Sequence, residues 1–202
     1  MGKKFLNLLK KIPIDLGQAN QRHTTKGKLI ALDLVGHGSG DDKALDVGCR
    51  DGYFTKLLEV RGYNVISVDI EKKFEKCIVD DVNKPLPYRD NAFNLIWCSE
   101  VIEHLEEPLK VIKEFRRILV PGGLAVLTTP NSQFWLFKIL KIFGLNPRDM
   151  QNPGHLHFFG INDIKKFNPE YICGFFSYII FKYKITKLIN LLSPTFVFLI
   201  KK

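Results

Sequence analysis

The sequence predicts an α/β protein with a doubly wound, mostly parallel sheet and an antiparallel C-terminal edge. Short apolar runs that end in polar or glycine residues resemble buried parallel strands, and five of them follow one another: Lys43–Gly48, Asn64–Ile70, Lys76–Asp80, Phe93–Cys98 and Gly123–Thr129. Helical patterns separate them at Tyr53–Arg61 and Leu109–Leu119, and Pro121-Gly122-Gly123 closes the second helix. Such alternation of strand and helix is typical of a parallel sheet.

The remaining segments fit around this core within one domain of 202 residues, 46% of them hydrophobic. Residues 1–40 form a basic N-terminal segment with a helix expected at 24–35, and residues 41–131 form the core. Residues 132–202 complete the domain on the substrate side. There we expect closing strands at 175–181 and 195–202, with a helix over 182–192 between them.

Cysteine usage and hydropathy indicate a cytoplasmic protein without a transmembrane segment. The four cysteines form no C-x-x-C pair, so neither a zinc ribbon nor a disulfide framework is predicted. Lys10 and Lys11 interrupt the first apolar stretch, which argues against a signal peptide. The most apolar later stretches, 134–145 and 175–181, are shorter than the roughly 20 residues that a spanning helix needs.

The net charge of +9 is unevenly distributed along the chain. Residues 1–40 carry a net +5 and residues 131–202 a net +7, whereas residues 41–130 carry a net −3. These basic flanks could contact RNA, an anionic membrane surface or an anionic substrate. A solvated lysine face is the alternative interpretation.

A glycine-rich turn follows the first predicted strand. Gly48-Cys49-Arg50-Asp51-Gly52 leads directly into a helix, whose free N–H groups favour a carboxylate or phosphate. Arg50 and Tyr53 occupy the second and third glycine positions of the dinucleotide fingerprint, and the Gly-Lys-Ser/Thr of a P-loop is absent. The turn alone is equally explained by a tight strand-to-helix connection.

Two acids stand at the ends of the next strands, where open α/β sheets bind ligands. Asp69 ends the second strand, 17 residues after Gly52, close to the spacing at which an acid reaches a ribose hydroxyl. Asp81 follows the third strand. Each acid also has a structural explanation, because aspartate is common in turns.

Four segments, in this order, resemble the motifs of class I S-adenosylmethionine methyltransferases: ALDVGCRDGYFT (44–55), SVDIE (67–71), DDVNKPLPYRDNAFNLIWCSEVIEHL (80–105) and EFRRILVPGGLAVLTTPN (114–131). The resemblance is to small type-11-like domains and implies a Rossmann-like fold. It also implies that Asp46 and the backbone of Gly48, Cys49, Arg50 and Gly52 hold the methionine end of S-adenosylmethionine. Asp69 would hold the ribose, and the adenine would meet Asp81 and the amide of Val82. Ile70, Cys98 and Ser99 would line the cofactor.

The sequence departs from the family pattern at three points. Arg50 replaces the middle glycine of the turn, so the turn could bend differently or attract the methionine carboxylate. Asn94 stands where the family has aspartate, at a position that we interpret as structural. Twelve residues separate Asp69 from Asp81, too few for a full helix and strand, so we expect a turn there and an open adenine side.

A cluster of two acids and a histidine follows the fourth strand. On a helix, Glu100, Glu103 and His104 would share one face, where two carboxylates and an imidazole suit Mg²⁺ or Mn²⁺. Alternatively, Ser99 caps this helix and the glutamates only favour its N-terminal dipole. The E-x-x-E-H run resembles the metal motif of ubiquinone-pathway O-methyltransferases and of small-RNA ribose methyltransferases. This resemblance adds His155 as a fourth metal ligand.

These observations predict a methyltransferase whose acceptor is a hydroxyl on a small or lipid-linked molecule. A hydroxyl must lose its proton, and His104 and Glu103 are the predicted catalytic residues for that step. Two alternatives remain: an RNA ribose 2′-O-methyltransferase and a non-catalytic cofactor-binding scaffold. The apolar run 134–143 suits a lid helix, a membrane-facing amphipathic helix or ordinary core packing.

Overall fold

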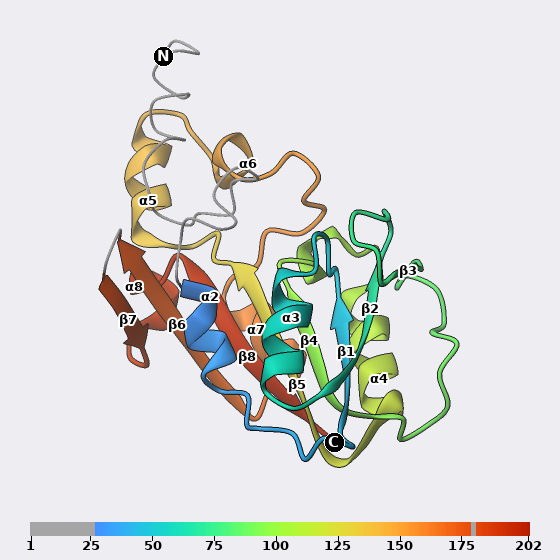
Figure 1. The fold of residues 1–202 in the computed structure, drawn as a ribbon. Coiled ribbons are helices and arrows are strands. Elements are labelled where there is room, and N and C mark those ends of the chain that lie inside the picture. Colours follow the sequence, from blue (N-terminus) through green and yellow to red (C-terminus); the bar gives the residue numbers. More distant parts are fainter. Residues whose placement is uncertain (1–26, 179–180) are drawn as a thin grey trace.

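The computed structural model describes residues 27–178 and 181–202, which form one eight-stranded sheet. The strand order is β3-β2-β1-β4-β5-β8-β6-β7 (Figure 1). Strands β1 to β5 pair in parallel, whereas β8 and the β6–β7 hairpin pair antiparallel. This topology confirms the predicted fold class. The strands are β1 Lys43–Val47, β2 Asn64–Asp69, β3 Cys77–Val79, β4 Phe93–Ser99, β5 Leu119–Pro130, β6 Tyr171–Tyr178, β7 Phe181–Ile185 and β8 Thr195–Lys201.

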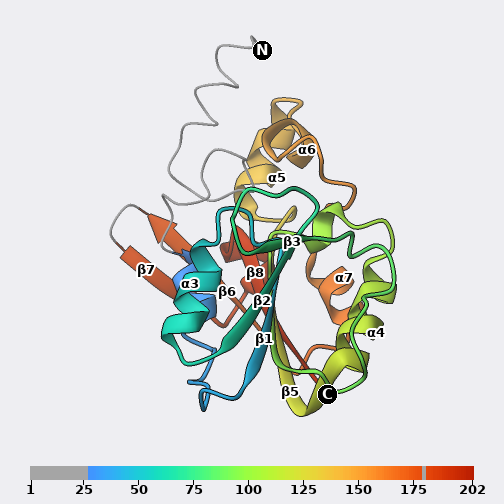
Figure 2. The same cartoon turned by 45° about the vertical axis from the view of Figure 1, so that its right-hand side comes forward.

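Helices cover both faces of the sheet, which is why the central strands are continuous apolar runs. One hydrophobic cluster joins α4 and α7 to the sheet through Phe115 and Ile164, and another joins α2 and α3 through Ala31 and Leu58. Figure 2 shows α3 on one side of the sheet and α4 with α7 on the other. The helical segments are α2 Gly27–Leu32, α3 Tyr53–Val60, the 3-10 turn η1 Ile102–His104, α4 Pro108–Ile118, α5 Trp135–Ile142, α6 Pro147–Met150, α7 Ile161–Lys166 and α8 Ile189–Leu192.

The connection between β2 and β3 is a turn, as the short spacing predicts. The described chain has no helix between these two strands, and the apolar side chains of Ile70, Ile78 and Val79 are exposed. Asn94 is structural, because its side-chain oxygen accepts a hydrogen bond of 3.0 Å from the N–H of Lys43 at the start of β1.

Three expected boundaries are wrong or incomplete. The helix expected over 182–192 is shorter than predicted, because β7 extends the sheet to Ile185 and only Ile189–Leu192 are helical. The alternation in Phe181-Lys-Tyr-Lys-Ile is the period of an edge strand, which pairs with β6. At the other end of the core, β5 begins at Leu119 and includes Pro121-Gly122-Gly123, which we expected to separate helix from strand. The helix expected at 24–35 is observed at Gly27–Leu32, and its residues 24–26 lie outside the described part, as do residues 1–26 of the basic segment 1–40.

Among the helices of residues 27–178 and 181–202, none combines the length and apolar character needed to cross a lipid bilayer.

Candidate functional site

The glycine-rich turn joins β1 to α3 in a conformation that requires glycine at its first position. Gly48 has a φ of 76°, and a Cβ atom added there would lie 2.3 Å from the Val101 side chain. The N–H groups of Gly48 and Cys49 both donate to the Val68 carbonyl, at 2.8 and 3.1 Å. The turn is therefore anchored to β2 and held close to Val101.

Asp69, at the end of β2, accepts hydrogen bonds from the glycine-rich turn and from the chain that follows β2. Its Oδ2 accepts a hydrogen bond of 3.0 Å from the N–H of Arg50, and its Oδ1 accepts one of 3.1 Å from the N–H of Glu71. Arg50 has a φ of 50°, in the left-handed region that glycine adopts readily. The turn thus keeps a glycine-like backbone at Arg50, and its N–H bond to Asp69 satisfies the backbone there.

A cavity of about 360 Å³ opens at the carboxyl ends of β1, β2 and β4, the edge at which open α/β sheets bind ligands. Its volume lies within the usual range for small-molecule sites. The cavity brings together seven of the predicted cofactor-binding residues and two of the predicted metal ligands: Gly48, Arg50, Asp69, Ile70, Asp81, Val82, Ser99, Glu100 and His104.

A smaller cavity of about 40 Å³ shares Gly48, Arg50, Ser99 and Glu100 with the first. It adds three residues from elsewhere in the fold: Lys28 of α2, Cys49 of the turn and Trp97 of β4. The indole Nε1 of Trp97 is buried and has no hydrogen-bond partner among the described residues. Sequence reasoning missed Lys28 and Trp97, because only the tertiary structure brings α2 next to the glycine turn.

Three predicted cofactor-binding residues line neither cavity. Asp46 and Cys98 are buried within the strands, with 1% and 0% of their surfaces exposed. A Cβ at Gly52 would lie 2.7 Å from the Phe74 ring, so this glycine is needed for packing. The cavities therefore open at the strand ends, and these three residues do not line them.

Asp46 is a buried carboxyl group with an unusual pKa. Thr55 Oγ1 donates a hydrogen bond of 2.6 Å to Asp46 Oδ2, and Ser67 Oγ lies 2.9 Å from Thr55 Oγ1. Burial raises the pKa of Asp46 to about 7, although the Thr55 hydrogen bond partly offsets this effect. Because the folded-state pKa lies above the ordinary value of 3.8, the folded protein binds this proton more tightly than the unfolded chain, and stability falls as the pH rises toward 7.

Asp46→Asn is therefore expected to remove part of this pH dependence. The free energy of unfolding of the variant, relative to wild type, should rise by about 2 to 3 kcal/mol between pH 5 and pH 8. Urea unfolding at both pH values measures the change, and the exposed Asp41→Asn is the matched control. A difference between variant and wild type that stays constant across this range would contradict the raised pKa.

The segment after β4 departs from the regular helix expected over Glu100–His104. Glu100 has a φ of 58°, and a single 3-10 turn at Ile102–His104 follows it. Ser99 does not cap this turn through its side chain, because its Oγ lies 2.9 Å from Thr128 Oγ1. Since Glu100 is not helical, it does not share a helix face with Glu103 and His104. Its Oε1 accepts a hydrogen bond of 3.0 Å from Thr128.

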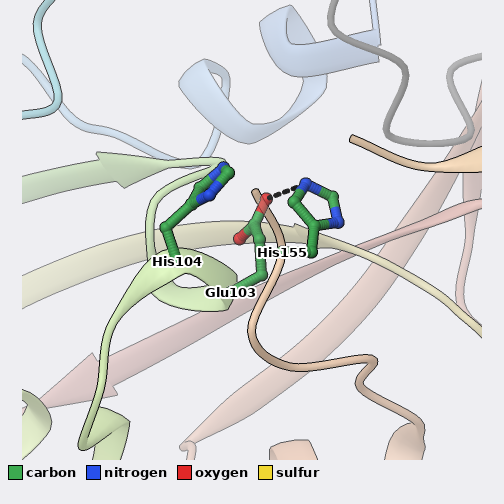
Figure 3. A group of neighbouring side chains, drawn as sticks. All are labelled: Glu103, His104 and His155. Carbon is green, nitrogen blue, oxygen red and sulfur yellow. Dashed lines mark ion pairs between the residues drawn. The ribbon is translucent and has the colours of Figure 1, made fainter. Parts of the chain in front are cut away.

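Glu103, His104 and His155 converge, as Figure 3 shows. One potential ligand atom from each lies within 4.8 Å of the others, whereas Glu100 is not part of this group. Glu103 Oε2 accepts a hydrogen bond of 3.0 Å from Thr129 Oγ1, and Glu103 Oε1 lies 3.8 Å from His155 Nε2. Glu103 Oε1 and His155 Nδ1 are buried without hydrogen-bond partners among the described residues. Buried polar atoms without a partner are rare in native proteins, and a bound ion or water is one of the explanations for them.

The surroundings favour neutral forms of Glu103 and His155. Burial, together with the charge of Glu100, raises the pKa of Glu103 well above its usual range. Burial and the nearby His104 lower the pKa of His155 to about 4. The 3.8 Å contact between them is therefore not a salt bridge at neutral pH, and a cation bound by Glu103 would displace its proton.

His104 is oriented by the loop that carries His155. Its Nδ1 lies 2.9 Å from the carbonyl oxygen of Gly154, which can only accept, so Nδ1 is the donor and, in a neutral ring, Nε2 is the nitrogen with the free electron pair. The N–H groups of Leu156 and His157 donate to the Glu103 carbonyl, at 2.9 and 3.0 Å. These bonds hold the 154–157 loop against η1. Thr128 and Thr129 at the end of β5 donate hydrogen bonds to Glu100 and Glu103. Two polar residues at the end of a buried strand were the feature of the sequence that could have indicated this role.

Comparison with known proteins assigns the chain to a family. Residues 19–171 match the family model described as a methyltransferase domain. The ubiquinone biosynthesis O-methyltransferase of Dechloromonas aromatica is 28% identical over 54% of this chain and 52% of that protein. The protein of the same name from Pseudomonas aeruginosa UCBPP-PA14 is 25% identical over 64% and 60%. The chain thus spans about half the length of the curated relatives it matches.

Solved structures share the fold at low sequence identity. A SAM dependent methyltransferase from Archaeoglobus fulgidus has a TM-score of 0.63 at 18% identity, covering 88% of this chain and 95% of that one. A possible histamine N-methyltransferase from Thermotoga maritima also has a TM-score of 0.63, at 14% identity and 86% coverage of both chains. The family match and the shared fold show that the chain belongs to the methyltransferase-domain family, with the class I S-adenosylmethionine methyltransferase fold.

Proposed function

We propose that this protein transfers the methyl group of S-adenosylmethionine to an oxygen atom of a small-molecule or lipid-linked acceptor. One observation carries the proposal: the cavity that holds the tips of β1 and β2 also reaches the half-buried His104, which converges with the buried Glu103 and His155. A cofactor site and groups able to handle a proton therefore meet at one edge of the sheet. The curated relatives are named as O-methyltransferases, which supports oxygen as the acceptor atom.

The cavity residues fit the cofactor by their chemistry. Each Asp69 oxygen accepts one backbone hydrogen bond and retains lone pairs for a ribose hydroxyl. Asp81 and the backbone of Val82 would bind the adenine, and the turn from Gly48 to Gly52 would hold the methionine end. Arg50 and the unpartnered Trp97 Nε1 offer donors for the methionine carboxylate.

Glu103, His104 and His155 would hold a divalent cation such as Mg²⁺ or Mn²⁺. The unpartnered Glu103 Oε1, the His104 Nε2 lone pair and the buried His155 ring supply three ligand atoms. A bound cation would lower the pKa of the acceptor hydroxyl. The Gly154 carbonyl fixes the His104 tautomer, and Thr129 orients Glu103, as supporting groups commonly do at metal sites.

The methyl of S-adenosylmethionine is already activated, so the protein's main task is to align the acceptor and exclude water. Alignment alone contributes about 7–11 kcal/mol in well-oriented systems. In the absence of a cation, His104 Nε2 is the available base for the acceptor proton. Glu103, which burial keeps protonated, is not.

The first test of this proposal is incubation with radiolabelled S-adenosylmethionine and fractionated cell extract. Label in polar metabolites or lipid supports the proposed acceptor class, whereas label in RNA favours the ribose methyltransferase suggested by the basic flanks. Calorimetry with S-adenosylmethionine separates both from a scaffold that has lost the site, which would release no heat.

Metal removal is expected to lower methyl transfer at least about tenfold. The measurement compares transfer to the labelled fraction before and after treatment with a chelator, with Mg²⁺ or Mn²⁺ added back as the control. S-adenosylmethionine affinity should stay unchanged, because Asp69, Asp81 and the glycine turn do not belong to the proposed ligand set. Full activity after chelation would remove the cation from the proposal and leave His104 as the base.

A further inference from the structure

Helix α5 presents apolar side chains on two opposite faces. Its inner face packs against the protein through Phe137 and Leu140, which form a separate small cluster with Phe134 and Met150. Its outer face carries Trp135, Ile139, Ile142 and Phe143, which we call the α5 apolar face. Their spacing of i, i+4, i+7 and i+8 places them on one side of the helix.

The α5 apolar face is exposed to a degree that packing does not explain. The exposed fractions are 80% for Ile142, 59% for Phe143, 43% for Ile139 and 40% for Trp135. Single exposed apolar residues are ordinary, but a contiguous group of large ones marks an interaction surface.

Basic residues flank this face, and within residues 132–158 no free acid opposes them. Lys138 and Lys141 are exposed on α5, and Arg148 is exposed on α6. Asp149 is the only acid in residues 132–158, and its Oδ2 accepts a hydrogen bond of 2.7 Å from the N–H of Asn146. Aromatic and aliphatic side chains beside lysines are the composition of helices that lie in the interface of anionic membranes.

The position of α5 relates this surface to the cofactor cavity. Only four residues separate α5 from Pro130, the last residue of β5, and Figure 1 shows α5 and α6 beyond the carboxyl end of that strand. The cavity opens at the carboxyl ends of the parallel strands. A surface bound through α5 would therefore lie at the same end of the sheet as the cavity.

We propose that the α5 apolar face docks on an anionic lipid bilayer, with Ile142 and Phe143 entering the interface and Lys138 and Lys141 meeting the lipid headgroups. This contact does not depend on the proposed methyl transfer, because it requires neither cofactor nor acceptor. A failed lipid test would leave the catalytic proposal intact, and loss of catalysis would leave the lipid contact intact.

Flotation of the full chain with vesicles tests the proposal. Wild type should float with mixed phosphatidylcholine and phosphatidylglycerol vesicles, bind pure phosphatidylcholine more weakly, and be released by high salt. The double variant Ile142→Asn/Phe143→Ser should lower the partition coefficient on the order of tenfold per side chain. Lys138→Gln/Lys141→Gln should lower it about fivefold per lysine on anionic vesicles only. Val60→Ser is the matched control, because Val60 is an apolar residue of α3 that is 83% exposed.

Tryptophan fluorescence supplies a second readout at α5 itself. The chain has two tryptophans, of which Trp97 is 1% and Trp135 is 40% exposed. Anionic vesicles should therefore shift the emission of Trp135 to shorter wavelength and shield it from acrylamide, and Trp135→Phe should abolish the shift while the protein still floats.

Three results would overturn the proposal. The first is wild type that stays unbound on anionic vesicles. The second is acrylamide shielding of Trp135 without vesicles in a monomer, because another part of the chain would then cover the face. The third is a wild-type dimer that the Ile142/Phe143 variant converts to monomer without any vesicle binding, which would make the face an interface between two copies.

Discussion

Replacing Asp69 with alanine is expected to weaken S-adenosylmethionine binding by at least about 100-fold. Hydrogen bonds to a charged group contribute roughly 1.5–3 kcal/mol each, and two bonds to the ribose would be lost together. The substitution also removes the acceptors for the N–H groups of Arg50 and Glu71, so the turn loses its connection to β2. Calorimetry with S-adenosylmethionine measures the affinity.

Two further variants separate these effects. Asp69→Asn keeps one carbonyl oxygen that can accept one of the two backbone hydrogen bonds, but it loses the second acceptor and the charge, so it should show an intermediate loss of affinity. Glu75→Gln removes an exposed acid that lines neither cavity and should bind like wild type. Thermal unfolding of each variant shows whether it is folded. A folded Asp69→Ala protein with unchanged affinity would show that the cofactor site lies elsewhere.

Glu103→Gln is expected to lower methyl transfer by about 10²–10⁴-fold and to leave S-adenosylmethionine affinity unchanged. Glutamine keeps the size of the side chain and can still accept the hydrogen bond from Thr129. It cannot supply a charged oxygen to a cation. Mn²⁺ binding, followed by electron paramagnetic resonance, should weaken in parallel with the rate.

Glu106→Gln is the matched control for this variant, because Glu106 is an exposed glutamate three residues away that does not belong to the converging group. It should keep both activity and Mn²⁺ binding. If Glu103→Gln stays fully active, the buried carboxyl group has only a structural role. Loss of activity with unchanged Mn²⁺ binding would instead indicate that Glu103 acts without a metal.

The order of strands and helices could be predicted because buried parallel strands and amphipathic helices leave different periods in the sequence. The turn that replaces a helix between β2 and β3 was also predictable, from the twelve-residue spacing of Asp69 and Asp81. Strand β7 was mistaken for helix because five residues are too few to distinguish the period of a strand from that of a helix. Its antiparallel pairing with β6 makes it a strand.

The candidate site likewise has features that the sequence predicts and features that only the structure shows. Sequence placed Gly48, Asp69 and Asp81 at successive strand ends, and in a parallel sheet such ends share one edge, so their meeting at the cavity follows from topology. A one-dimensional pattern could not show that Glu100 leaves the helical path, that Asp46 and Cys98 are buried and line neither cavity, or that Lys28 and Trp97 line the smaller one. Those outcomes depend on side-chain directions and on contacts between distant segments.

By itself, then, the sequence determined the fold class, the edge of the sheet at which the cavity opens and the family, since each follows from local periodicity and the order of motifs. Only the tertiary structure decided which acids and histidines lie together. Glu103 and His155 are 52 residues apart in the chain and become neighbours because the 154–157 loop bonds to η1. Burial then raises the pKa of Glu103 and lowers the pKa of His155. Burial is a property of the packed protein and cannot be read from the order of residues.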